Sequence, residues 1–393
     1  MNAKTLKDID VENKKVLLRV DFNVPFQDGK IVDDSRIVAA LDTIKYLIDH
    51  NAIVIICSHL GRPDGKKDKK YSLEPVANYL AKLLQKDVLF VEDIFGKNTK
   101  PLIENLEPKD VVLLENVRFY KQEEECEKEF SKKLASLADI YVNDAFGTMH
   151  RKHASTYGVA EFLPSAVGLL VEKELSAFDK LNNPERPLVA ILGGAKVKDK
   201  LPIVENLLNI ADTILIGGGM SYTFVKAIGG EVGDSLVDET KVELAGQILE
   251  KAKEKGVKIV LPIDNVCANA FRIDAEKKSF NSAFIPMGYQ GMDIGKKTIK
   301  LFKKYIRSAK TIVWNGPMGV YEFPRFAKGT IKIAKAVAKS RAYSIIGGGD
   351  SAASIKSLKL NKKVGHISTG GGVSLRLLEG KTLPAVDIIS SQN

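Results

Sequence analysis

The chain has 393 residues, of which 45% are hydrophobic and 27% charged, and a formal net charge of +10. Its length predicts two domains rather than one core, and its composition is typical of a soluble globular protein. Three scattered cysteines without CxxC spacing exclude a disulfide framework and a zinc site. No secretory signal or membrane-spanning apolar run is evident, so we expect a reduced, cytoplasmic protein.

The excess of positive charge does not by itself indicate nucleic-acid binding. Most basic residues are lysines interleaved with acids, and no basic tail or aromatic-studded basic strand is present. A nucleic-acid-binding surface would gather lysines on one face and bind in a strongly salt-dependent way. We therefore expect neither a nucleic acid nor a membrane as partner, and interpret most lysines as solvated surface charge.

The first 166 residues alternate short apolar runs with helical patterns. Such alternation predicts βαβ units around a mostly parallel sheet, in which ligands bind beyond the carboxyl ends of the strands. The predicted strands are Val16–Val20, Ile53–Cys57, Val88–Val91, Val111–Leu114 and Ile140–Val142, and helical patterns between them include Leu73–Leu84 and Glu127–Leu137.

A row of polar side chains follows the first predicted strand. Arg19, Asp21 and Asn23 alternate, so in an extended chain they point to one side, and a turn at Asp28-Gly29 returns the chain to Arg36. This arrangement can bind an anion that carries hydroxyl groups. A buried Arg19–Asp21 ion pair that only holds the strand end is the alternative.

Further basic residues follow the other strands of this half. Arginine suits bidentate recognition of phosphate or carboxylate, so a rim built from several loops predicts an anion site, with solvated loop charge as the alternative. These residues are His59, Arg62, Arg118 and Arg151.

A helical pattern at 167–181, closed by Asn182-Asn183-Pro184, is expected to join two domains. Beyond it, strands end in glycines instead of arginines. Glycine lets backbone approach a base or a phosphate closely, and a following helix offers its first amides to anions, so the repetition favours a nucleotide cleft over ordinary tight turns. The glycine runs are Gly193-Gly194, Gly217–Gly219, Gly347–Gly349 and Gly370–Gly372, after predicted strands Leu188–Leu192, Thr213–Ile216, Ser344–Ile346 and His366–Thr369.

Charged residues near these glycines have two interpretations each. Lys196, Lys198 and Lys200 can place cations on a polyphosphate, although no Walker A spacing is present. Asp350 can hold Mg²⁺ on a nucleotide or act as a helix N-cap. Glu322 can accept hydrogen bonds from ribose or be a solvated surface acid.

A dinucleotide-binding fingerprint also matches Gly347–Ala352. The acidic residue expected about 20 positions further is absent, because the next predicted strand ends in His366–Thr369. We therefore place a dehydrogenase below a kinase.

Taken together, the motifs resemble the phosphoglycerate kinase family nearly from end to end. They are RVDFNVP, DSRI, SHLGRP, ENVRF, NDAFGTMHR, GGAKVKDK, WNGPMGVYE, GGGDS and HISTGGG, in that order. The resemblance implies reversible, Mg²⁺-dependent phosphoryl transfer between 1,3-bisphosphoglycerate and ADP, giving 3-phosphoglycerate and ATP in glycolysis, by a monomer. It further implies two doubly wound domains that close about a hinge.

The resemblance also implies domain bounds. Residues 1–166 would bind the glycerate and 182–372 the nucleotide, 167–181 would form the interdomain helix, and 373–393 would return to the first domain. Hinge bending is expected at the 167–181 helix and at Gly370–Gly372.

Site roles carried over by motif fall into two groups. For the glycerate substrate they are Asp21 and Asn23 on its hydroxyl, with Arg36, His59, Arg62, Arg118 and Arg151 on its phosphate and carboxyl end. Near the moving phosphoryl group are Lys196 and Lys200, with Gly371 and Gly372 donating backbone amides to it, and Asp350 would bind the magnesium ion. The remaining nucleotide-binding residues are Gly193, Gly194, Gly217, Gly218, Gly291, Asn315, Pro317, Glu322, Gly348, Gly349 and Ser351.

The chemistry agrees with this assignment. A carboxylate acceptor is already anionic at pH 7, so the transfer needs positioning and charge neutralisation rather than a general base. Arg36 and Lys200 are expected to stabilise the transition state. A binding or regulatory protein that keeps the fold without turnover is the alternative; Val373 and Arg376, which replace the family's usual alanine and glutamate, leave the glycines intact.

Overall fold

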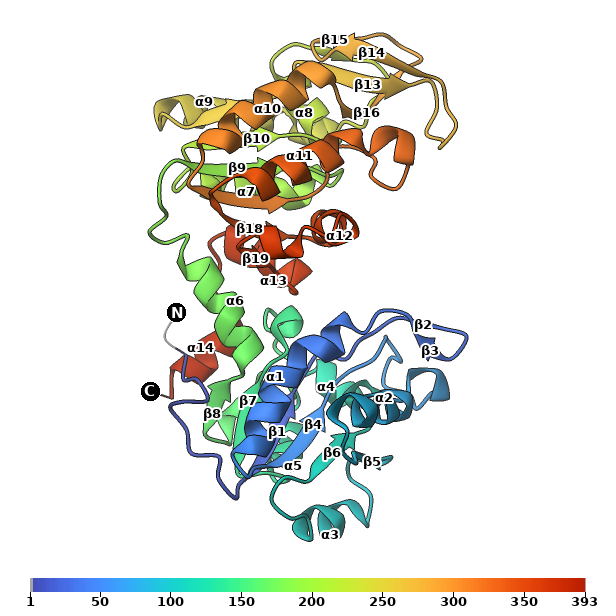
Figure 1. The fold of residues 1–393 in the computed structure, drawn as a ribbon, viewed down its shortest axis with the longest axis vertical. Helices are drawn as coiled ribbons and strands as arrows, with labels where there is room; N and C mark the ends of the chain where they lie inside the picture. Colours follow the sequence, from blue (N-terminus) through green and yellow to red (C-terminus); the bar gives the residue numbers. More distant parts are fainter. Residues whose placement is uncertain (1–2, 393) are drawn as a thin grey trace. The chain divides into compact units, whose positions relative to one another are not determined.

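The computed structural model describes residues 3–392. The chain divides into two compact units, Met1–Ser176 together with Thr382–Asn393, and Ala177–Lys381. Each unit is a parallel sheet covered by helices, which confirms the predicted α/β class with two doubly wound sheets (Figure 1). No helix in the described part of the chain is long and apolar enough to cross a membrane.

The first unit contains a six-stranded parallel sheet of order β5-β6-β4-β1-β7-β8. Its strands are β1 (Lys15–Arg19), β4 (Ile53–Cys57), β5 (Leu89–Val91), β6 (Val111–Leu114), β7 (Ile140–Asn143) and β8 (Ser165–Val167), beside a short hairpin of β2 (Phe26–Gln27) and β3 (Lys30–Ile31). Its helices are α1 (Ser35–Asp49), α2 (Glu74–Leu84), α3 (Thr99–Glu104), α4 (Lys121–Glu124), α5 (Lys128–Ala135) and α14 (Pro384–Ser390), with α6 (Leu169–Asp179) leading to the second unit.

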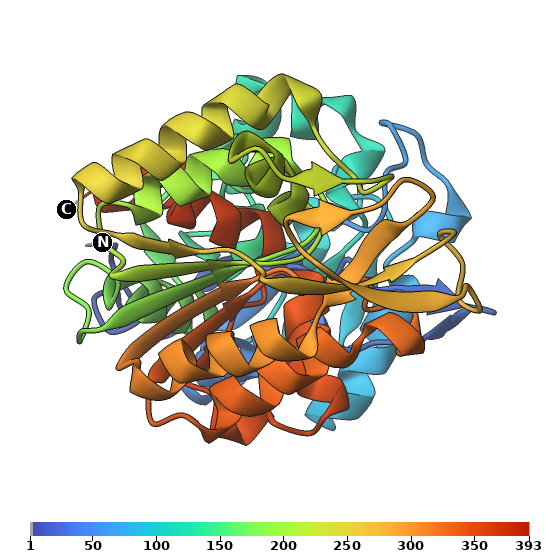
Figure 2. The same cartoon turned by 90° about the horizontal axis from the view of Figure 1, so that it is seen from above.

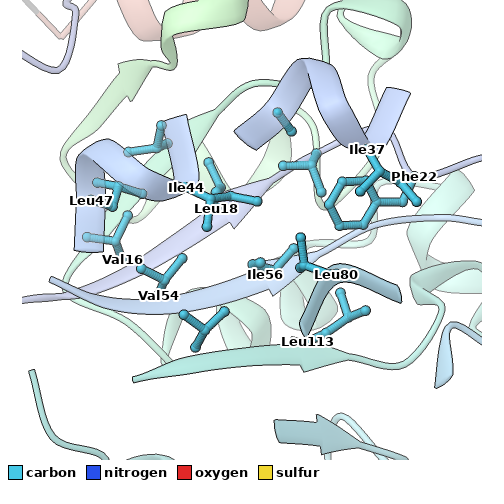
Figure 3. Close-up of a cluster of buried hydrophobic side chains, with 14 of the residues drawn as sticks. Val16, Leu18, Phe22, Ile37, Ile44, Leu47, Val54, Ile56, Leu80 and Leu113 are labelled. Carbon is cyan, nitrogen blue, oxygen red and sulfur yellow. The ribbon is translucent and has the colours of Figure 1, made fainter. Parts of the chain in front are cut away.

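The strands of this sheet are continuous apolar runs because both faces are covered. On one face, Ile37, Ile44 and Leu47 of α1 pack against Val16 and Leu18 of β1 (Figure 3). Val16, Leu17 and Leu18 of β1 are fully buried, and Asp21 and Asn23, which follow the strand, lie at the carboxyl edge of the sheet.

The second unit repeats the design with the order β12-β10-β9-β17-β18-β19. Its main strands are β9 (Leu188–Leu192), β10 (Thr213–Ile216), β12 (Lys258–Val260), β17 (Thr311–Asn315), β18 (Tyr343–Gly347) and β19 (His366–Ile367). Two small sheets are added by β11 (Glu231–Val232), β13 (Asp264–Ala268), β14 (Lys277–Asn281), β15 (Phe284–Ile285) and β16 (Gln290–Ile294).

Helices cover both faces of this second sheet. They are α7 (Val197–Leu207), α8 (Met220–Ala227), α9 (Val242–Glu254), α10 (Lys296–Ser308), α11 (Lys328–Lys339), α12 (Gly349–Ser357) and α13 (Gly371–Leu378). Figure 2 shows α9 on one side of the sheet and the adjacent pair α10 and α11 on the other. The strand order reverses between β9 and β17, and such a switch point is where open α/β sheets bind ligands.

Three sequence expectations need correction. Val167, predicted as helical, ends strand β8, and the helix begins only at Leu169. The small sheets of the second unit were not predicted, because their short strands lack a clear alternating pattern. Residues 373–381, expected in the returning segment, belong to the second unit, where α13 packs on α7 and Asn206 Nδ2 donates to the carbonyl of Leu378.

The chain's last segment does return to the first unit. α14 packs beside β8, and Gln392 Oε1 accepts a hydrogen bond from the amide of Ser165 at 2.9 Å. Near the other end, the amide of Val167 donates to the carbonyl of Lys4 at 2.8 Å. Both ends of the described chain are therefore held at β8.

Candidate active site

An ion pair stands at the carboxyl end of β1. Arg36, on the first turn of α1, donates from Nη1 to both carboxylate oxygens of Asp21, at 2.9 and 3.0 Å. His59, which follows β4, has its Nδ1 4.0 Å from Asp21 Oδ1. The partner of Asp21 is thus Arg36 and not Arg19, so the alternative of a purely structural Arg19–Asp21 pair is wrong.

Gly61 connects two more predicted residues to this edge. Asn23 Oδ1 accepts from the Gly61 amide at 2.9 Å, and Arg118 Nη1 donates to the Gly61 carbonyl at 2.8 Å. Arg62, next along the chain, is exposed. The β4 loop therefore lies between Asn23 and Arg118, and the strand-end residues converge as their spacing predicted.

Behind this edge lies a buried hydrogen-bond chain that the sequence did not reveal. Arg19, 1% exposed, donates from Nε to Ser155 Oγ at 2.8 Å. Ser155 Oγ in turn donates to Glu123 Oε1 at 2.6 Å, and its amide donates to Glu123 Oε2 at 2.8 Å. Glu123 is fully buried, and burial raises its pKa although Arg19 and Ser155 favour its charged form.

Arg19 also orients His59. Its Nη2 lies 3.3 Å from His59 Nδ1, and because a guanidinium only donates, Nδ1 accepts and the neutral ring carries its proton on Nε2. Burial lowers the pKa of His59 well below its ordinary value, and Arg19, Arg118, Arg36 and Arg151 lower it further. His59 is therefore a neutral donor among four permanent cations.

Arg151 lies in the same cluster, with its Nε 3.3 Å from His150 Nε2. Neighbouring His153 was missed at the sequence level; burial, followed by the charges of Arg118 and Arg151, lowers its pKa to about 3. The cluster is strongly electropositive, which suits an acid carrying phosphate and carboxyl groups.

The second unit contains a pocket of about 620 Å³ at the switch point between β9 and β17. Twelve predicted nucleotide-site residues line it: Gly194, Lys196, Lys200, Gly218, Gly291, Asn315, Pro317, Glu322, Gly348, Gly349, Asp350 and Gly371. The prediction missed its apolar wall, which includes Tyr222, Leu236, Phe271, Met292 and Val320, because these residues carry no motif of their own.

Four predicted residues do not line the pocket. Gly193 and Gly217 are packing glycines: a Cβ on Gly193 would lie 2.1 Å from the Pro317 carbonyl oxygen, and one on Gly217 2.7 Å from Met318 Sδ. Ser351 is fully buried, and its Oγ accepts from the Gly316 amide at 2.7 Å. Gly372 lies at the exposed start of α13, outside the lining.

Lys200 enters this pocket from α7 and is 8% exposed. Its Nζ donates to Asn315 Oδ1 at 2.8 Å and to the Asn315 carbonyl at 3.3 Å. Burial lowers the pKa of Lys200 to about 8, against the opposing effect of Asp350. Asn315 Nδ2 is buried without a hydrogen-bond partner beside Gly348, so an oxygen-rich ligand would satisfy it.

Asp350 is an exposed residue in the first turn of α12. The N-cap of that helix is Gly348 and no side chain caps it, so the N-cap interpretation of Asp350 is wrong. No group of three or more His, Cys, Asp or Glu among residues 3–392 could hold a metal ion by itself. A magnesium ion here would need ligands from a bound phosphate.

One doubly wound unit has a cluster of arginines at a sheet edge, and the other has a glycine-lined pocket that contains a buried lysine. This combination is typical of a phosphotransferase of the α/β class. Residues 6–381 match the family model described as phosphoglycerate kinase. The chain belongs to the phosphoglycerate kinase family.

Individual phosphoglycerate kinases are similar to this chain over nearly their full length. The phosphoglycerate kinases of Clostridium tetani and Finegoldia magna are each 54% identical over 395 residues, covering 100% of this chain and 98% and 100% of theirs. The solved phosphoglycerate kinase of Coxiella burnetii is 42% identical with a TM-score of 0.92, and covers 100% of both chains. That of Pyrococcus horikoshii is 38% identical with a TM-score of 0.85, covering 99% of both.

Proposed function

We propose that this protein transfers a phosphoryl group reversibly between 1,3-bisphosphoglycerate and Mg·ADP, giving 3-phosphoglycerate and Mg·ATP, in cytoplasmic glycolysis. The observation that carries the proposal is the pairing, in one chain, of the arginine cluster around Asp21 with the pocket around Lys200. The first offers charge to a phosphorylated acid, and the second offers backbone amides and a lysine to a polyphosphate.

In the first unit, Asp21 and Asn23 would hold the glycerate hydroxyl, while Arg36, Arg62, Arg118 and Arg151 would bind its phosphate and carboxyl groups. The Asp21–Arg36 ion pair supports this role, because it holds the guanidinium at the carboxyl edge of β1. His59 would add a neutral N–H from Nε2, since Arg19 occupies Nδ1.

In the second unit, the apolar wall near Leu236 and Val320 would hold the base, and Glu322 the ribose. The amides of Gly348, Gly349 and Gly371 would face the phosphates. Asp350 would hold Mg²⁺ on the phosphate oxygens; a single exposed carboxylate on the pocket wall fits an ion that takes most of its ligands from nucleotide and water. Magnesium would supply charge neutralisation between phosphates.

The transfer itself needs no general base, because the acceptor carboxylate is already ionised at pH 7. Arg36 and Lys200 would neutralise charge that develops on the moving phosphoryl, an electrostatic effect that is stronger in a site that excludes water. Each substrate is bound by a different unit, so we propose closure about α6 and the segment at Gly370–Gly372 to bring them in line.

A coupled assay with 3-phosphoglycerate and MgATP tests the proposal, comparing wild type with Lys200→Ala and Arg36→Ala. Robust turnover in the wild type and a loss of about 10²-fold or more in both folded variants is expected. A folded wild type without turnover, which still binds MgATP, would point instead to a binding or regulatory protein.

A further inference from the structure

A basic groove runs between α10 and α11 on the outer face of the second unit. It has a volume of about 340 Å³ and is lined by Lys303, Ile306, Arg307, Lys332, Lys335, Ala336, Lys339 and Ser340. None of these residues lines the pocket that contains Lys200. The two helices lie side by side in Figure 2.

The charge on these two helices is of one sign. α10 has six basic residues and α11 has four, and neither helix contains an aspartate or a glutamate. Within residues 3–392, none of these ten side chains forms an ion pair. On α9, by contrast, Lys251 pairs with Glu205 at 2.9 Å and Lys253 with Glu250 at 2.7 Å.

This arrangement opposes helix stability. Like charges four residues apart repel each other, as in Lys303 with Arg307 and Lys335 with Lys339. A bound anion would remove the repulsion.

The geometry points to a particular kind of anion. The floor is formed by Ile306 and Ala336, and the partly buried Lys303 and Lys332 stand on opposite helices. Packed helices have axes about 8–10 Å apart, so cations on both rims can contact one thin chain between them. Lysine acts as a point charge, which suits an anion recognised by charge density rather than by shape.

We propose that the basic groove binds an inorganic polyphosphate chain. No aromatic side chain lines the groove, and single-stranded nucleic acids depend on aromatic platforms for base stacking. A bare chain of phosphates needs only the double row of cations. The inference is independent of the proposed catalytic function, since the two sites share no residue.

The test measures binding of short-chain polyphosphate to the full-length protein by calorimetry, with 3-phosphoglycerate and MgADP saturating the other sites. The groove variant is Lys303→Gln/Lys332→Gln/Lys335→Gln. Its control, Lys251→Gln/Lys253→Gln/Lys255→Gln, removes the same charge from α9 and the turn after it. Melting temperatures establish that both variants are folded.

The groove variant is expected to bind at least about 10-fold more weakly than wild type, with the control close to wild type. Its slope of log affinity against log salt should fall by about 2, as about 0.7 per lost phosphate contact predicts. Equal weakening in both variants would show diffuse attraction to net charge and overturn the proposal. So would polyphosphate binding that vanishes when the substrates are present.

A second measurement does not depend on the variant. Amine-reactive labelling of the wild-type protein, read by mass spectrometry, should show polyphosphate protecting Lys303, Lys332 and Lys335 but not Lys251. Absence of that protection would overturn the proposal, as would protection of the groove only by oligonucleotides or by anionic vesicles.

Discussion

Lys200 Nζ lies 2.8 Å from Asn315 Oδ1, and both residues line the pocket of the second unit, where the lysine is almost fully buried. Because burial lowers the pKa of Lys200 to about 8, binding a polyphosphate beside it should restore the charged form. We expect MgATP binding at about pH 8.5 to take up a proton, measured by calorimetry in buffers of different ionisation enthalpy. Lys200→Met should abolish the uptake; an unchanged uptake would assign the proton to another group.

The same pKa has a consequence for stability. The ordinary pKa of lysine, 10.5, exceeds the folded value, so between about pH 8 and 10.5 the unfolded chain binds more protons and this residue's contribution rises with pH. Lys200→Met should therefore be more stable than wild type at pH 7, by up to a few kcal/mol, with the difference shrinking above pH 8. Chemical denaturation of both proteins at pH 7 and 10 measures this. A constant difference would contradict the lowered pKa.

Alanine substitutions at Gly218 and Gly229 can distinguish the effect of backbone conformation from that of close packing. Its φ is +64°, and a Cβ there would lie 2.5 Å from the Gly194 amide nitrogen. Gly229 has a φ of +86° with nothing within 4 Å of its Cβ position. Gly229→Ala should lose about 1 kcal/mol of stability to backbone strain alone. Gly218→Ala should lose more, because its Cβ also meets the backbone of Gly194, and it should weaken MgATP binding by about 10-fold or more. Equal nucleotide affinity in the two variants would contradict this role.

Glu123 should act as a positioning residue through Ser155 and Arg19. Glu123→Gln removes the buried charge opposite Arg19, with an expected loss of about 3 kcal/mol of stability. The KM for 3-phosphoglycerate should rise severalfold while the KM for MgATP stays unchanged, since the network lies in the first unit. Histidine ¹⁵N spectra should show His59 losing its single Nε2–H tautomer.

The matched control for that variant is Glu125→Gln, because Glu125 is exposed on the same segment. It should leave the stability, both KM values and the His59 spectrum unchanged. A Glu123→Gln enzyme that is less stable but has an unaltered His59 tautomer would limit Glu123 to a structural role.

The contribution of Arg36 to activity should depend on the planar shape of its guanidinium group as well as on its charge. Both hydrogen bonds to Asp21 come from Nη1, so Arg36→Lys can keep the cation and that contact but loses the other donors of the planar guanidinium. We therefore expect kcat/KM to fall by about 10²-fold. Arg186→Lys provides the control, since Arg186 forms a surface pair with Asp212 at 2.7 Å, and should retain full activity. Full activity in Arg36→Lys would show that charge alone suffices.

The α/β fold class with two doubly wound sheets could be predicted from the local pattern of the sequence. Strands such as Ile53–Cys57 and Val111–Leu114 have the predicted ends, because each is an uninterrupted apolar run bounded by polar residues, as expected of strands buried on both faces of a sheet. Residues that follow such strands lie at the carboxyl edge of their own sheet, as Asp21 does in the first unit and Lys196 in the second, so their placement at that edge could be predicted from chain order.

Which side chains are partners could not be read from the local sequence pattern and depends on how the chain folds in space. Asp21 is paired with Arg36, 15 residues away, while nearby Arg19 reaches Ser155, 136 residues along the chain. Such long-range contacts depend on how strands are ordered in the sheet, which local pattern does not encode. The same is true of the basic groove, because the lysines of α10 and α11 become one surface only where the two helices pack side by side.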